Sequence, residues 1–195
     1  MGRLISIFFT LISISLFAQE KQLVDSLLTE LNSSKSDTTT INLFCDLSWE
    51  YKENVPDTAF YYANKAVELS KNIENKDWSG KAFRSKGSCF LEIQDYDSAL
   101  LYFNKAILIA KKSNNVKLLN SIRGSVVSTL IETNKLTQAA ALNDSVISYY
   151  KSIDDKNKVG KLLNNQGIIY IKLNYTQNAI NAFIESIKIK EELED

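Results

Sequence analysis

The segment that decides the fold runs from residue 80 to residue 112 and reads GKAFRSKGSCFLEIQDYDSALLYFNKAILIAKK. Eighty residues later, residues 160–192 read GKLLNNQGIIYIKLNYTQNAINAFIESIKIKEE. Both segments have glycine at the first and eighth positions and alanine at the twentieth. Agreement of this kind at a fixed distance indicates an internal repeat.

The repeat has a period of forty residues. An alanine recurs at Ala59, Ala99, Ala139 and Ala179, and eight residues after each stands a β-branched residue, Val67, Ile107, Ile147 and Ile187. We therefore read residues 38–195 as four copies of one unit. Their approximate bounds are 38–77, 78–117, 118–157 and 158–195.

Each unit reads as two helices. In the second unit, Phe83, Gly87 and Phe90 lie at helical spacing, and a polar break at Gln94-Asp95 precedes a second helical face from Tyr96 to Ile107. Asp97 and Ser98 would stand in the first turn of that second helix, where short polar side chains suit unpaired backbone amides. The order is helix, tight turn, helix and short loop, four times.

These residues resemble the tetratricopeptide repeat, whose pattern is W-x2-L-G-x2-Y followed by A-x3-F. The second unit has F-x2-K-G-x2-F at residues 83–90 and A-x3-F at 99–103, and the fourth matches with Leu163, Gly167, Tyr170, Ala179 and Phe183. The third departs at Val127 and Asn143, and the first is one residue short before Ala59. The resemblance implies an all-α, right-handed α-solenoid of antiparallel helix pairs.

Residues 19–37 are expected to form a leading helix and a linker. Leu23, Leu27 and Leu31 form an apolar stripe that predicts a helix over residues 20–34, which would cover the first unit. Either Asp37 or Thr38 could cap the helix that follows. Because the period exceeds the usual thirty-four residues, we also expect longer helices, mainly the second of each pair.

Residues 1–18 read as a secretory signal peptide. Arg3 supplies a positive charge, residues 4–17 are uncharged and mostly apolar, and Ala18 offers a small side chain for cleavage. Fourteen helical residues span only about 21 Å, short of the roughly 30 Å hydrocarbon core. We expect an exported, periplasmic or extracytoplasmic bacterial protein; the alternative is an uncleaved N-terminal anchor.

The composition excludes several classes of function. The chain has 195 residues, with 23 Lys and Arg, 23 Asp and Glu, one proline, six glycines and no histidine. Zero net charge argues against binding nucleic acid or an anionic membrane through bulk charge. Without histidine the chain lacks the commonest general base and zinc ligand. We expect no enzyme activity, cofactor or metal.

The remaining chemical candidates are few. Cys45 and Cys89 could form a disulfide in an exported protein, but two buried free thiols are favoured by their spacing on neighbouring first helices. Gly80-Lys81 and Gly160-Lys161 lack the rest of a phosphate-binding loop. Asp154-Asp155 falls in a loop between units, where we expect solvated charge.

The resemblance places the functional surface in a concave groove lined by the first helices, which would receive a protein or peptide ligand. The groove candidates are Lys81, Arg84, Ser88, Ser128, Lys161 and Asn164. Ser121 and Ile168 face the same way. Membrane contact is expected only if residues 1–18 are retained or the chain belongs to a receptor.

Two hypotheses for the function follow. The first is an exported, non-catalytic scaffold for protein–protein interaction. The second rests on a resemblance to the exported sensory regions of bacterial histidine kinases, nucleotide cyclases and regulators, which show the same order of signal peptide, leading helix and repeats. That hypothesis expects a transmembrane stretch and signalling motifs encoded after Asp195, whereas the first expects a stop codon.

The repeat alanine gives a direct test of the register. Ala99 should lie where the two helices of the second unit cross, so Ala99→Leu should overpack the crossing and cost about 1–3 kcal/mol of unfolding free energy. Thermal unfolding measures the change. An unaltered melting temperature would show that Ala99 lies elsewhere.

Overall fold

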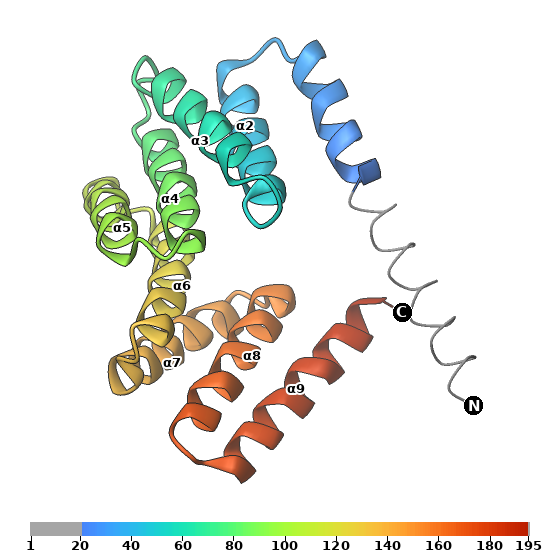
Figure 1. Ribbon diagram of the computed structural model, residues 1–195, viewed down its shortest axis with the longest axis vertical. Coiled ribbons are helices and arrows are strands. Elements are labelled where there is room, and N and C mark those ends of the chain that lie inside the picture. The colour runs from blue at the N-terminus through green and yellow to red at the C-terminus, as the bar shows by residue number, and fades with distance from the viewer. Residues whose placement is uncertain (1–20, 195) are drawn as a thin grey trace.

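The computed structural model describes residues 21–194, which form helices and no strands (Figure 1). A leading helix at residues 21–33 is followed by α2 (Asp37–Tyr51), α3 (Pro56–Ser70), α4 (Asp77–Glu92), α5 (Tyr96–Lys112), α6 (Val116–Glu132), α7 (Leu136–Ser152), α8 (Lys156–Lys172) and α9 (Thr176–Glu194). The expected signal peptide, residues 1–18, lies outside this range. Within it, no helix has the length and apolarity needed to cross a bilayer.

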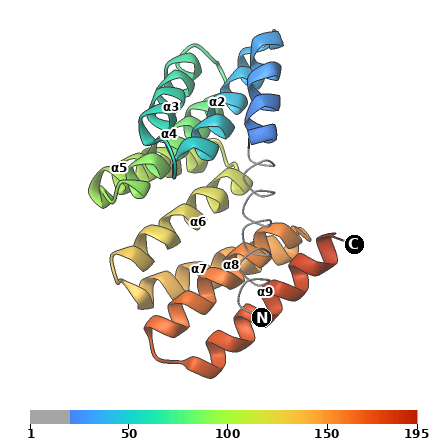
Figure 2. The ribbon, with the colours of Figure 1, turned by 45° about the vertical axis from the view of Figure 1, so that its right-hand side comes forward.

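The helices stack as four antiparallel pairs. From α2 to α9, each helix packs against the next along the chain, and the first helices of successive pairs, α2, α4, α6 and α8, also contact one another. Between α2 and α9, the second helices touch only their chain neighbours. The first helices therefore form the inner layer of a curved array and the second helices its outer layer (Figures 1 and 2). The all-α solenoid predicted from the repeats is confirmed.

Five turns between helices share one geometry and recur every twenty residues. Their central residues, with φ between 53° and 63°, are Gln94, Asn114, Asn134, Asp154 and Asn174. In each turn the following amide donates to a carbonyl five residues back, as Asp95 does to Phe90 over 2.9 Å. This hydrogen bond defines a Schellman C-cap, and Asn and Asp tolerate its left-handed conformation better than most other non-glycine residues.

The helix starts differ in part from the expectation. Asp97 and Ser98 do lie in the first turn of α5, but the capping side chain is that of Asp95, whose carboxylate accepts from the Ser98 amide. At α2, neither Asp37 nor Thr38 caps: the N-cap position is Ser36, and its side chain makes no capping hydrogen bond. The helix α2 therefore begins directly after Ser36, at the end of the polar linker, without a side-chain cap.

The longer period does not fall mainly on the second helix of each pair, so that expectation is wrong. In the third unit, α6 and α7 have 17 residues each. In the second, α4 has 16 and α5 has 17. The two helices of each of these pairs are therefore nearly equal in length.

The shortened first unit keeps the aromatic packing of the second. Tyr51 stacks on Tyr62 with ring centroids 5.9 Å apart. Phe90 stacks on Tyr102 at 5.4 Å in the same way. Tyr51 precedes Phe90 by 39 residues and Tyr62 precedes Tyr102 by 40, so the turn between α2 and α3 absorbs the missing residue.

A glycine marks the closest approach of the two helices in the second and fourth units. A Cβ built on Gly87 would lie 2.6 Å from the ring of Phe103 and 3.2 Å from the carbonyl oxygen of Ala99. Phe103 and Ala99 are themselves fully buried. Gly167 faces the ring of Phe183 in the same manner. The aromatic ring therefore occupies the volume that a side chain on the glycine would need.

The third unit changes both partners of this contact. Val127 replaces the glycine and Asn143 replaces the aromatic residue, and both are fully buried. The smaller Asn143 leaves room for the valine, and its Nδ2 donates to the carbonyl of Leu162 at 3.0 Å. The departure from the repeat pattern is thus a compensated exchange of volume.

Two glycines give a matched test of this packing. Gly87→Ala should cost about 1–3 kcal/mol of unfolding free energy, because the new methyl group meets a buried ring and a backbone carbonyl. Gly124→Ala should instead stabilise by about 0.5–1 kcal/mol, since its Cβ would have one neighbour, Leu162 Cδ2 at 3.9 Å, and alanine favours the helix. Urea unfolding measures both. Equal effects of the two substitutions would contradict this account of the crossing.

Candidate functional site

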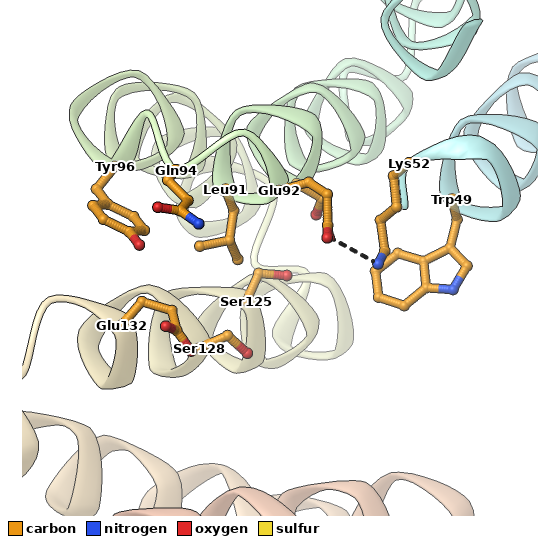
Figure 3. Close-up of a pocket in the computed structure, with 10 residues that line it drawn as sticks. Trp49, Lys52, Leu91, Glu92, Gln94, Tyr96, Ser125, Ser128 and Glu132 are labelled. Atoms are coloured by element: carbon orange, nitrogen blue, oxygen red, sulfur yellow. Dashed lines mark hydrogen bonds and ion pairs between the residues drawn. The ribbon is translucent and has the colours of Figure 1, made fainter. Parts of the chain in front are cut away.

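The concave face holds two clefts. The smaller cleft has a volume of about 370 Å³ and lies between α2, α4 with its following turn, and α6 (Figure 3). It is lined by Trp49, Lys52, Ser88, Leu91, Glu92, Gln94, Tyr96, Ser125, Ser128 and Glu132. The larger cleft, of about 870 Å³, lies between the C-terminal end of α2 and the helices α8 and α9. Trp49 and Lys52 line both clefts.

Trp49 is the large aromatic side chain at the junction of the two clefts. It is 51% exposed, and the Nζ of Lys52 lies 4.5 Å from its ring centroid. The same ammonium group forms ion pairs with Glu53 at 2.7 Å and Glu92 at 3.1 Å. One part of the indole therefore contacts the ammonium group of Lys52, which two ion pairs hold in place, and about half of its surface is open to solvent (Figure 3).

Lys52 stays charged although it is mostly buried. Burial, the largest single effect, lowers the pKa of Lys52, but hydrogen bonds to Glu53 and Glu92 and their negative charges outweigh it, and the pKa is raised. The two carboxylates come from different units, because Glu92 ends α4 and Glu53 follows α2. This ion-pair group therefore ties the first unit to the second at the floor of the groove.

A second group of charges involves the middle of α4 and the first turns of α8. Burial of the ammonium group, followed by the positive charges of Arg84 and Lys161, lowers the pKa of Lys158. The Nε of Arg84 is buried and has no hydrogen-bond partner. The positive charges of Arg84 on α4 and Lys161 on α8 therefore both act on Lys158, and the carboxylate of Asp155 opposes them in part. An anion placed beside these cations would offset their positive charge further.

The structure assigns the predicted groove residues to different places. Ser88 and Ser128 line the smaller cleft, and Lys161 and Asn164 line the larger one. Lys81 is engaged within the fold, with its Nζ 3.3 Å from Asn42 Oδ1 and 4.3 Å above the Trp78 ring. Arg84 is half-buried on α4 and lines neither cleft.

Several residues that line the clefts were not predicted from the sequence. Trp49 could have been found, because the 39-residue offset of the first unit aligns it with the groove residue Ser88. Ile189, Lys190 and Leu193 of α9 could not, since only the curvature of the whole array brings α9 opposite α2 in the larger cleft.

The candidate reactive groups have structural roles. Cys45 and Cys89 are free and buried, and burial raises the pKa of Cys45 to about 12. Asp155 caps α8, where its carboxylate accepts from the Lys158 amide at 3.0 Å. Within residues 21–194 no group of three or more acidic or thiol side chains is arranged to hold a metal ion.

Two segments of the chain match a known repeat family. The tetratricopeptide repeat family model matches residues 85–113 and 160–193, which cover most of the second and fourth helix pairs. The unmatched units are the two that depart from the repeat pattern at Val127, Asn143 and the shortened turn before Ala59. No curated protein sequence matches the chain.

Solved structures share the fold at low sequence identity. BtubC (BKLC) from P. vanneervenii has a TM-score of 0.64 and 13% identity, with 91% of this chain and 74% of that one covered. Aspartyl phosphate phosphatase F from Bacillus subtilis has a TM-score of 0.68 and 16% identity over 86% of this chain and 44% of its own, so our chain spans less than half its length. A putative kinesin light chain with TPR-like repeats from Podosopora anserina has a TM-score of 0.58 and 10% identity over 92% and 90%.

The thiols offer a simple chemical test. Native protein should not react with a thiol reagent at pH 8, because Cys45 and Cys89 are buried and protonated. After unfolding, two thiols per chain should titrate, with or without prior reduction. A count of zero in unfolded, unreduced protein would demonstrate a disulfide instead.

Proposed function

We propose that the concave groove binds a segment of another protein and catalyses no reaction, because two units match the tetratricopeptide repeat and the array folds as a curved solenoid. The observation that carries the proposal is Trp49. It is half-exposed at the junction of both clefts and braced by Lys52. Partly exposed aromatic residues in concave, otherwise polar surroundings are frequent anchors of protein interfaces.

The cations of α4 and α8 near Lys158 favour an acidic segment. Arg84, Lys158 and Lys161 form the cationic group, and the buried Nε of Arg84 has no partner of its own. A carboxylate side chain on the ligand would accept from the Arg84 guanidinium and offset the positive charges that act on Lys158. An apolar residue of the same segment would then pack on Trp49.

We further propose that this binding takes place outside the cytoplasm of a bacterium. Support comes from the sequence of residues 1–18, in which Arg3 precedes an apolar run and Ala18. The resemblance to exported sensory regions of signalling proteins stays a hypothesis. Mass spectrometry of the N-terminus of protein recovered from a periplasmic fraction tests export, since cleavage after Ala18 leaves Gln19 first.

The groove is tested by partner recovery. Trp49→Ala and Arg84→Ala should each reduce recovery of the bound protein from extracts by about 10- to 100-fold, as expected for anchor residues worth at least about 2 kcal/mol. Lys111→Ala, which removes an exposed cation from the outer helix α5, is the matched control and should leave recovery unchanged.

Folding and binding must be separated in this experiment. Each variant should keep the helical circular dichroism and melting temperature of the parent protein within a few degrees. Unchanged recovery with both Trp49→Ala and Arg84→Ala would place the binding surface outside the groove.

A further inference from the structure

Two pairs of isoleucines, each pair forty residues apart, show that the last unit leaves an apolar face open. Ile131 is 3% exposed, whereas Ile171, its equivalent in the fourth unit, is 52% exposed. Likewise, Ile147 is 7% exposed and Ile187 is 55% exposed. Residue type and repeat position are the same within each pair. The difference is therefore due to what covers them.

In the interior of the array the cover is the first helix of the following unit. Ile147 packs in one cluster with Val159 and Leu162 of α8, and Ile131 packs with Ile169 of α8. Among α2 to α9, α9 packs only against α8. Its far side, at the lower edge of the array, faces no other labelled helix (Figures 1 and 2).

The open face of α9 is also wider than its counterparts. Ile184 is 47% exposed, and its equivalents in the first three units are the exposed polar residues Asn64, Asn104 and Asp144. With Ile180 and Ile187 it forms a straight row at spacings of four and three residues, which we call the α9 stripe. A following repeat would leave the Ile184 position in water, as it does at Asn104, so it would not account for this isoleucine.

We propose that the α9 stripe pairs two copies of this chain, with the two α9 helices antiparallel about a two-fold axis near Ile184. The same three isoleucines, at 44%, 47% and 55% exposure, then supply both sides of one seam. Such self-complementary contacts are the commonest form of symmetric association. Isoleucines spaced by four and three residues are also the pattern by which paired helices pack.

The charges beside the stripe favour the antiparallel orientation. With Ile184 on the axis, Glu191 of one helix lies across from Gln177 of the other, and Lys188 lies across from Ile180. A parallel pair would instead place Lys188 opposite Lys188 and Glu191 opposite Glu191, which is unfavourable. Glu185 and Glu192 are already paired with Lys151 and Lys156, so they do not enter the seam.

Pairing at the stripe leaves the groove accessible. Ser186 and Ile189 of α9 line the larger cleft. At 100° per residue, Ser186 lies about 130° and Ile189 about 170° around the helix from the centre of the stripe. Lys190, which also lines that cleft, lies about 90° from it. The dimer therefore does not depend on the proposed groove function. A seam of one helix from each copy is small, so we expect a dissociation constant roughly in the micromolar range.

Sedimentation equilibrium of the full chain tests the proposal. The average mass should rise from monomer toward dimer between about 1 µM and about 1 mM. Ile184→Lys should weaken the dimer by on the order of 100-fold, because each dimer loses two buried isoleucines and gains two charges in the seam. Leu108→Lys is the matched control: Leu108 is 60% exposed on the outer helix α5, and its replacement should leave the dimer intact.

Cysteine cross-linking tests the orientation. Ile184→Cys should form a symmetric disulfide on mild oxidation, and a mixture of Gln177→Cys and Glu191→Cys chains should link mainly to each other. A monomer at all concentrations would overturn the proposal. So would association that survives Ile184→Lys, which would assign the contact to another surface such as the leading helix. Preferential self-linking of Gln177→Cys would overturn the antiparallel arrangement.

Discussion

The close crossing of two helices within each unit is the constraint on which the array depends. In the second unit Gly87 lets the ring of Phe103 lie directly against the backbone of α4, and the buried Ala99 keeps the two helices near each other. A wider crossing would tilt the second helix and move the surface on which the next unit packs. Because the units are joined in series, the curvature of the concave face follows from this local contact.

The turns supply the second regularity. Left-handed C-caps at twenty-residue intervals end the five helices from α4 to α8, so the second and third pairs are each made of two similar half-units. Glycine, the usual residue at such caps, is absent from all five positions. Asn, Asp and Gln occupy them, which explains how a chain with six glycines can contain this many tight turns.

The periodic part of the structure could be predicted from the sequence, and the long-range part could not. The forty-residue spacing of the alanines predicted the helix pairs, and the family resemblance predicted a groove along the first helices. Ser88, Ser128, Lys161 and Asn164 do line clefts there, whereas Lys81 and Arg84 do not. The twenty-residue turn period was also present in the sequence. It was harder to recognise because its residues are similar in type rather than identical. Trp49 was hidden by the one-residue deletion that shifts the first unit out of register.

The larger cleft has a mechanical property that follows from how its walls are connected. One wall is the end of α2 and the other is α8 with α9, yet α2 and these helices are not in contact within the part of the chain described. Its width is therefore the sum of small rotations at three successive junctions between units. A small change in the angle at each junction would add up along the array and change the width of the cleft. The distance between Trp49 on one wall and Lys161 on the other is therefore set by the relative angles of all four units.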